Sequence, residues 1–510
     1  MGDSRTKNTS RNILAGLWNR FSTIILSFIN RTIIIYILGA EFSGLNSLFL
    51  SVIGVLSIAE LGIDMAIVQS MYKPIAEGNK KRICELLTLY KKSYYIVGVV
   101  IISIGLALIP FMPYLIHDEL PSSVNLYTLY LLYLLNSALG YFMFAYRESL
   151  LYAHQREDIS QIFRTTVLIG KNIVQAIVLL VFRQYYAYLL IEIGATIANN
   201  IWVGVKTQKI YPEYQCVREK VKMPSEIKEQ LKGLVLGNVC DRARNSLDSI
   251  ILSAFLGLTV VAIYNNYYYI YSALYGTILV VCNAMSASVG NSIVTETVEK
   301  NYENLQKFSF AVAWLTGWIG ICMMCLYQPF MELWMGKELM LSNFNMILFC
   351  VYFYAINMNN IRNQFISGTG IWWKLKYSNI GEAIGNVVLN IVLGKLFGIT
   401  GILLATIITI IVFNFIWRTK ILFNNYFKSM SLKEFFMNHG YWILCIGIAA
   451  MATWSICQRI QASIIVTMVI NAVICVVVPN VILLILLYRT KQFQNAKMFA
   501  LKVLSGFKRG

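Results

Sequence analysis

Apolar and polar stretches alternate along the 510-residue chain in a pattern typical of membrane-spanning helices. About fourteen apolar stretches provide roughly the 20 residues that a helix needs to cross about 30 Å of hydrocarbon. The pattern therefore predicts an all-α integral membrane protein with about 14 transmembrane helices. We place the polar breaks between these helices near residues 39–46, 72–92, 115–125, 147–160, 182–184, 206–232, 257–262, 296–308, 330–342, 366–377, 395–400, 418–439 and 457–461.

Positive charge is concentrated in every second connection. Of the 43 Lys and Arg residues, about 33 lie in alternate connections and at the termini, about 4 in the other connections and about 6 within spans. Because loops rich in Lys and Arg are retained on the cytoplasmic side, we expect both termini in the cytoplasm. The first apolar run, of about 27 residues, is too long for the core of a cleaved signal peptide and predicts a retained span.

The composition leaves no room for a sizeable soluble domain. Hydrophobic residues make up 57% of the chain and charged residues 13%. The longest polar connection, residues 206–232, is too short to build a hydrophobic core of its own. The net charge of +18 arises mainly from connections expected in the cytoplasm, so the expected neighbours are anionic membrane lipids and not nucleic acid.

Two parts of the chain resemble each other at an offset of 218 residues. YILGAEFSGLNSL at 36–48 aligns with AFLGLTVVAIYNN at 254–266, which places Gly39 on Gly257 and Gly44 on Ala262. Such a repeat predicts two related lobes with a substrate path between them near the midplane of the bilayer. The expected segments are a cytoplasmic N-terminus at 1–10, a lobe of six spans at 11–205, a cytoplasmic linker at 206–232, a second lobe of six spans at 233–418, two further spans within 439–488 and a cytoplasmic tail at 489–510.

Residues 44–92 resemble the second-span signature of bacterial polysaccharide flippases of the O-antigen and capsule type, within the multidrug/oligosaccharidyl-lipid/polysaccharide exporter superfamily. The matching features are Gly44-Leu45 in a small outer turn, an acidic-Leu-Gly centre at 60–62 and a basic loop after 76–78. The resemblance implies translocation of an undecaprenyl-diphosphate-linked oligosaccharide across the bacterial cytoplasmic membrane by alternating access. It further implies a polysaccharide polymerase and chain-length machinery as partners.

Other functions are weaker alternatives. A flippase for the peptidoglycan lipid precursor shares the diphosphate lipid and differs only in its sugars, which makes it the second hypothesis. In a cation-coupled multidrug exporter, we expect acids and no unpaired arginines in the first lobe. The arginines of the first span do not fit this expectation. A membrane polymerase or ligase needs a sizeable outer loop with convergent acids or histidines, and the outer loops here are short. We therefore expect no enzyme activity.

Charged residues within the predicted spans are the candidates for a functional site. Each costs roughly 2.5–3.5 kcal/mol at a helix centre, so we expect them to face a water-filled cavity or one another. Arg362, near the inner end of its span, could also snorkel to the interface. The charged residues are Arg20, Arg31, Lys171, Arg242, Arg244 and Arg362 on the basic side, and Glu60, Asp64, Glu192, Asp241, Asp248 and Glu382 on the acidic side.

Arg20 and Arg31 form a stripe on the first span. Eleven residues at roughly 100° each bring them to within about 20° of the same face, about 16 Å apart. No acid in this span can neutralise either, and a guanidinium suits the bidentate oxygens of a diphosphate. We expect these two arginines to bind the diphosphate, with Lys171 as a third candidate; partnering with acids of the second span is the alternative.

The seventh span combines both signs of charge. Arg242 and Arg244 are further candidates for diphosphate binding. Asp241 and Asp248 are candidates for a coupling-ion site, although Arg244 and Asp248 are four residues apart and can instead pair with each other.

Two acids on the second span form a further candidate pair. Glu60 and Asp64 lie one turn apart, and two like charges at close range raise one pKa, as a coupling-ion or proton site requires. Neutralisation of Arg20 or Arg31 explains them equally well.

Tyrosines gather at the start of the eighth span. Tyr264, Tyr268, Tyr271 and Tyr275 follow helical spacing and could stack against sugar rings, whereas an aromatic belt at the membrane interface is the simpler explanation.

Cysteine and histidine give no metal or redox motif. The ten cysteines show no metal-ligand spacing, and Cys322-x-x-Cys325 lies in an apolar helix where packing is the expected role. No cofactor is expected.

Overall fold

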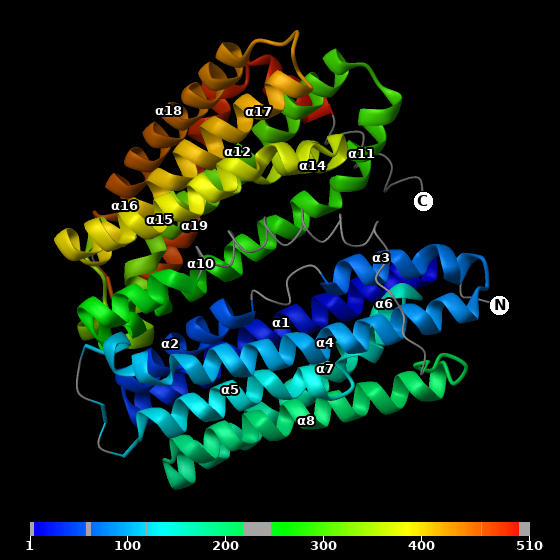
Figure 1. Ribbon diagram of the computed structural model, residues 1–510. Helices are drawn as coiled ribbons and strands as arrows, with labels where there is room; N and C mark the ends of the chain where they lie inside the picture. Colours follow the sequence, from blue (N-terminus) through cyan, green and yellow to red (C-terminus); the bar gives the residue numbers. More distant parts are fainter. Residues whose placement is uncertain are drawn as a thin grey trace. The chain divides into compact units, whose positions relative to one another are not determined.

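A computed structural model describes residues 5–57, 63–117, 120–121, 123–217, 246–460 and 462–498, and every structural statement below refers to this part of the chain. The described residues form helices joined by turns, with no strand among them (Figure 1). They divide into two compact units, Met1–Ala262 and Ile263–Gly510. The expectation of an all-α membrane protein is confirmed.

The first unit is a bundle in which α1, α4, α5, α7 and α8 run side by side (Figure 1). Short 3-10 segments follow α4 (η2, Ile109–Leu115) and precede α6 (η3, Ala145–Arg147). The α-helices are α1 (Arg5–Leu38), α2 (Ala40–Leu56), α3 (Ile63–Ala76), α4 (Lys80–Leu108), α5 (Leu126–Phe142), α6 (Glu148–Ala153), α7 (Glu157–Phe182), α8 (Tyr185–Ile210) and a helix at Ser246–Leu256.

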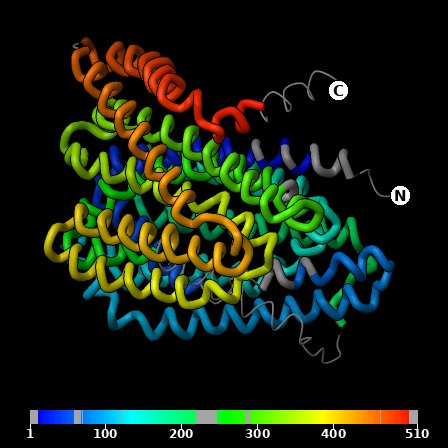
Figure 2. The backbone as a smooth tube through the Cα atoms, turned by 90° about the horizontal axis from the view of Figure 1, so that it is seen from above, coloured from blue at the N-terminus to red at the C-terminus, as the bar shows by residue number. Residues whose placement is uncertain are grey.

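The second unit is built on the long helix α12, against which α18 and α19 pack. In Figure 2, the red trace of α19 lies outermost among the helices of this unit. Short 3-10 segments occur at η4 (Lys337–Leu339) and η5 (Ile371–Leu375). The longer elements are α10 (Leu258–Ala284), which begins in the first unit, α11 (Ser286–Thr295), α12 (Val298–Met335), α13 (Asn343–Asn357), α14 (Asn360–Thr369), α15 (Lys376–Phe397), α16 (Ile399–Thr409), the π-helix η6 (Ile410–Trp417), α17 (Arg418–Asn425), α18 (Leu432–Cys457) and α19 (Ile464–Leu487).

Helix ends fall at each of the thirteen predicted breaks, but several spans are not single straight helices. Nine described helices are long and apolar enough to cross a membrane, or ten if the pair Leu126–Phe142 and Ala145–Ala153, bent by 46°, counts as one span. The predicted tenth span is divided at Met358–Asn359 into α13 and α14. A count of long, straight apolar helices therefore gives fewer spans than a count of the polar breaks between them.

The two glycines aligned by the internal repeat adopt the same unusual conformation. Gly39 has φ of 107° and Gly257 has φ of 91°, values that residues with a Cβ rarely adopt. Each forms a one-residue turn between consecutive helices, α1 to α2 and Ser246–Leu256 to α10. The turn geometry therefore supports the repeat found in the sequence, while the lobe boundaries stay a prediction.

The surface of α19 has the character of a helix in contact with lipid. Ile465, Val469, Val473, Val477 and Val481 recur every fourth residue and are all exposed. The opposite stripe, residues 471, 475, 479, 483 and 487, is buried against the unit. Exposed aliphatic side chains in such a continuous stripe are unfavourable in water and favourable in hydrocarbon.

Candidate functional site

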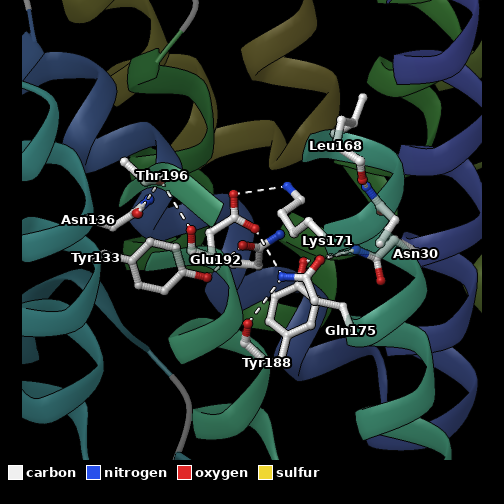
Figure 3. A network of polar contacts seen from close by, with 11 residues as sticks. Asn30, Tyr133, Asn136, Leu168, Lys171, Gln175, Tyr188, Glu192 and Thr196 are labelled. Carbon is white, nitrogen blue, oxygen red and sulfur yellow. Dashed lines mark hydrogen bonds and ion pairs between the residues drawn. The ribbon is translucent and has the colours of Figure 1, made fainter. Parts of the chain in front are cut away.

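A polar network crosses the interior of the first unit where α1, α7 and α8 pack together (Figure 3). Its charged centre is an ion pair in which Lys171 Nζ lies 3.0 Å from Glu192 Oε1. Lys171 comes from α7 and Glu192 from α8, two antiparallel helices joined by a two-residue turn at 183–184. Lys171, predicted as a third diphosphate ligand, therefore has an acid beside it.

Neutral polar side chains connect this ion pair to α1. The Gln175 side-chain amide donates to Glu192 Oε2 at 3.0 Å and to the Tyr188 carbonyl at 3.1 Å. In turn, Asn30 Nδ2 donates to Gln175 Oε1 at 2.9 Å (Figure 3). Gln175 is fully buried and Asn30 almost so, so each needs these partners to offset the loss of water.

The network continues along α8 to α5 and α2. Thr196 donates to Asn136 Oδ1 at 2.7 Å, one turn beyond Glu192 (Figure 3). The hydroxyl of Tyr133 donates to Asn46 Oδ1 at 2.6 Å and lies 2.7 Å from the Tyr185 hydroxyl. Five helices of the unit, α1, α2, α5, α7 and α8, thus meet through buried or partly buried hydrogen bonds, which suits a bundle that moves as one body.

A stripe of asparagines on α1 determines which way the predicted arginines face. Asn12, Asn19 and Asn30 donate to Gln155, Thr165 and Gln175, which lie on α7 or just before it. Arg20 and Arg31 each follow one of these asparagines by one residue, so the arginine stripe is turned about 100° away from α7. Helix α1 is continuous, so both arginines stay on one face, as the spacing requires.

The two arginines differ in their surroundings. The Arg20 side chain is exposed. Arg31 is half-buried, and its guanidinium donates to the carbonyl oxygen of Ala262 at 3.3 Å. Ala262 is the residue that the repeat aligns with Gly44, so Arg31 reaches the start of α10.

Several predicted site residues lie outside the described part of the chain. Arg242, Arg244, Asp241 and Glu60 fall in undescribed segments, and the side chain of Asp64 is also not described. Asp248 is buried, with 4% of its surface exposed.

The predicted tyrosines form a ladder of rings along α10. Ring centroids of Tyr264–Tyr268, Tyr268–Tyr271 and Tyr271–Tyr275 are 5.2 to 6.2 Å apart. Tyr264 and Tyr271 are buried against Phe349 and Tyr352 of α13, the latter with ring centroids at 4.5 Å from Tyr271. Tyr268 and Tyr275 stay partly exposed, so only these two present a ring surface to a ligand in this conformation.

The second unit contains a buried cationic cluster. Arg418 Nη2 lies 2.7 Å from Glu382 Oε2, and both side chains are less than a tenth exposed. Arg362, 1% exposed, donates to Thr419 Oγ1 at 2.7 Å and lies over the Phe415 ring. The expectation that Arg362 could snorkel to the interface is wrong, because η6 and α17 provide it with polar partners and an aromatic face inside the bundle.

A hollow of about 600 Å³ with a mixed polar and apolar lining opens at the end of the first unit that the charge pattern assigns to the cytoplasm. Four tyrosines line it, and Arg164 pairs with Glu148 on its wall at 2.7 Å. Tyrosine rings combined with charged hydrogen-bonding groups suit a polar, hydroxyl-rich ligand. The tyrosines are Tyr72, Tyr90, Tyr94 and Tyr152.

Sequence reasoning counted Glu192 and Glu382 among the intramembrane acids but assigned neither a role. The signal for Glu192 was present, because opposite charges occurred in consecutive spans separated by a two-residue turn. The partnership of Glu382 with Arg418, 36 residues apart, depends on helix packing and had no comparable signal.

Solved structures of membrane transporters have a similar fold. The inward closed conformation of the lipid II flippase MurJ has a TM-score of 0.69 at 14% identity, covering 93% of this chain and 98% of that one. An inward-facing multidrug resistance MATE transporter of the MOP superfamily has a TM-score of 0.61 at 14% identity, covering 80% and 96%. A MOP superfamily transporter from Pyrococcus furiosus gives 0.54 at 13%, covering 82% and 96%. No curated protein matches the sequence.

The fold and its apolar spans define a multi-pass helical membrane protein, and this fold is shared with the solved membrane transporters described above. The sequence profile of the protein family described as "Polysaccharide biosynthesis protein" matches residues 7–289, more than half of the chain. The chain belongs to this polysaccharide biosynthesis protein family, and the resemblance noted from residues 44–92 is confirmed.

Proposed function

We propose that the protein is a flippase for undecaprenyl-diphosphate-linked oligosaccharide repeat units, acting by alternating access in the synthesis of O-antigen, capsule or exopolysaccharide. The observation that carries the proposal is membership of the polysaccharide biosynthesis family, combined with an arginine stripe turned away from α7. Passage of a charged lipid headgroup through hydrocarbon needs compensating cations inside the protein, and this stripe supplies them.

In this proposal, Arg20 and Arg31 bind the diphosphate in succession. The two are about 16 Å apart along α1, which is longer than a diphosphate, so one headgroup engages one guanidinium at a time. Arg20 is exposed and Arg31 half-buried. On the predicted topology, Arg20 lies nearer the cytoplasmic end of α1 and Arg31 nearer its outer end, which fits two successive positions on one path. Arg242 and Arg244 are further proposed ligands. Lys171 is a weaker one, because Glu192 already offsets its charge.

The remaining site residues are proposed to serve the sugars and the coupling ion. Tyr268 and Tyr275 present partly exposed rings for stacking on the oligosaccharide. Glu60, Asp64, Asp241 and Asp248 are the proposed coupling-ion or ion-pair acids. A polysaccharide polymerase and chain-length machinery are proposed as partners downstream of the flippase.

The diphosphate role is tested by expressing variants in a strain that lacks the gene and measuring the export of surface polysaccharide. Arg20→Ala and Arg31→Ala should each abolish export, while membrane levels of the protein, measured by immunoblot, stay normal. Arg31→Lys keeps the charge but loses the bidentate fork, so we expect only partial export. Arg183→Ala, which removes an exposed arginine at the α7–α8 turn, is the matched control and should export normally. Normal export by both α1 alanine variants would disprove the diphosphate role.

A flippase for the peptidoglycan lipid precursor is the second candidate, favoured by the fold likeness to the lipid II flippase MurJ. The two candidates differ in the consequence of deletion. Loss of the peptidoglycan precursor should cause lysis, whereas loss of a surface polysaccharide repeat unit should leave viable cells without that polymer. Lysis on depletion, rescued by the wild-type gene, would favour this second candidate.

A further inference from the structure

Four cysteines from three helices come together inside the second unit. Cys322 and Cys325 lie on α12, Cys457 ends α18, and Cys475 lies in the middle of α19. The Sγ atoms of Cys325, Cys457 and Cys475 all lie within 4.8 Å of one another. Cys322 is one turn from Cys325, and its thiol approaches the Cys475 carbonyl at 3.8 Å.

Tryptophan side chains of α12 hold α19 in this position. Trp318 Nε1 donates to the Cys475 carbonyl at 2.8 Å, and Trp314 Nε1 donates to Asn480 Oδ1 at 2.9 Å. Cys475 belongs to the buried stripe of α19 that faces the unit. The convergence therefore rests on hydrogen bonds that fix the depth of α19 along α12.

The environment of these thiols matches a closed metal site. Cys325, Cys457 and Cys475 are 7%, 5% and 0% exposed. Four thiolates around a tetrahedral Zn²⁺, each at about 2.3 Å, have sulfurs about 3.8 Å apart. The three Sγ atoms reach this geometry with shifts of about 1 Å, within the range of small side-chain rotations.

We propose that the thiols of Cys325, Cys457 and Cys475, with Cys322 as a fourth ligand, bind one thiophilic d¹⁰ cation, Zn²⁺ or Cu⁺. Soft sulfur ligands select these ions over the hard cations Mg²⁺ and Ca²⁺. Each ligating thiol releases its proton on binding, and the cation offsets the thiolate charge that an apolar interior otherwise disfavours. The ion would fasten α18 and α19 to α12, and this inference does not depend on the transported substrate.

Sequence spacing did not point to this site. Cys322 and Cys325 gave a C-x-x-C pair in an apolar helix, whereas Cys457 and Cys475 are more than 130 residues away along the chain. A metal site assembled from three helices has no local motif, because packing alone brings the ligands together.

Metal content of the full-length protein purified in detergent tests the proposal. Elemental analysis should find about one Zn or Cu per chain, either as isolated or after incubation with ZnCl₂ alone or with an acetonitrile complex of Cu⁺ under anaerobic conditions. Cys457→Ser and Cys475→Ser should each lower the bound metal at least tenfold. Cys445→Ser and Cys350→Ser, which change buried cysteines outside the cluster, should keep it.

Thiol protection in the wild-type protein gives a second readout that needs no variant to fold. Chelator-treated protein should be alkylated by N-ethylmaleimide at Cys325, Cys457 and Cys475, and protein reloaded with the metal should be protected there. Absence of metal uptake, equal uptake in the serine variants, or a disulfide between two of these cysteines found by mass spectrometry would each overturn the proposal.

Discussion

Lys171 and Glu192 face each other across α7 and α8 at 3.0 Å, and they are the charged centre of a hydrogen-bond network that reaches α1, α2 and α5. The pair is only partly exposed, 16% for Lys171 and 31% for Glu192. An ion pair inside the bundle holds α7 and α8 at a fixed position along each other's axes. The arginines of α1, Arg20 and Arg31, lie on a face turned away from α7.

Removing one member of this pair should destabilise the protein. Glu192→Gln and Lys171→Met each leave a charge or a polar group without its partner, and we expect a loss of about 1.5–3 kcal/mol in the free energy of unfolding. The double variant Lys171→Met/Glu192→Gln should lose less than the sum of the two. Thermal unfolding in detergent measures all three; additive losses would mean that the two side chains do not interact.

Removing the acid of the buried ion pair in the second unit should lower the stability more than Glu192→Gln does. The Glu382–Arg418 pair is less than a tenth exposed, and the buried guanidinium of Arg362 donates to Thr419, the residue next to Arg418. Glu382→Gln removes the acid that compensates this cationic cluster, so we expect a loss of about 3–5 kcal/mol. Comparison of its melting temperature with that of Glu192→Gln checks the order; a smaller loss for Glu382→Gln would contradict it.

Gly44 should not tolerate a side chain. A Cβ at this position would clash with the backbone carbonyl of Leu258, which cannot rotate away as a side chain can. We expect Gly44→Ala to lower the stability by about 3 kcal/mol and to reduce the amount of protein in the membrane. Gly140→Ala is the control, because a Cβ there meets no other group, and it should fold normally.

His154 should make the stability depend on pH. Its ring stacks on Tyr211 with centroids at 4.3 Å, and its Nδ1–H donates to the Leu150 carbonyl. Burial lowers the pKa of His154 below its ordinary value of 6.5, an effect only partly offset by the Leu150 carbonyl and by Glu213. The folded state therefore binds fewer protons than the unfolded state, so stability is full above about pH 6.5 and falls below it.

The pH dependence is measurable by thermal unfolding between about pH 7.5 and 5.5. The melting temperature of the wild-type protein should fall more over this range than that of His154→Gln, which cannot be protonated. Parallel curves for the two proteins would show that His154 carries none of the dependence.

Much of the fold could be predicted from the pattern of polar breaks. Each of the thirteen breaks contains a helix end, because a membrane span must be apolar over its length and its ends must reach water. The turn at Gly39 and its counterpart at Gly257 were also visible, since an aligned glycine signals a backbone that residues with a Cβ avoid. The division of the tenth span at Met358–Asn359 was not predicted, because this segment has no charged break and was counted as one apolar stretch.

The site could be predicted only as a set of candidates. Spacing placed Arg20 and Arg31 on one face, and the continuous helix α1 keeps them there. Spacing could not tell that α7 takes the asparagine face of α1, that Lys171 meets Glu192, or that Tyr271 is covered by Tyr352. These facts depend on the rotation of each helix about its axis.

The order of apolar and charged residues along the chain is enough to place this protein in a membrane, to locate the polar breaks between its spans and to identify the charges that must be accommodated within them. These properties follow from the transfer of individual residues between water and hydrocarbon, which needs no knowledge of neighbours. Which charges compensate each other, and which cysteines meet, follows only from the packing of the helices. A contact between helices depends on their rotation and relative depth, which are set by packing over many residues at once and leave no local trace in the chain.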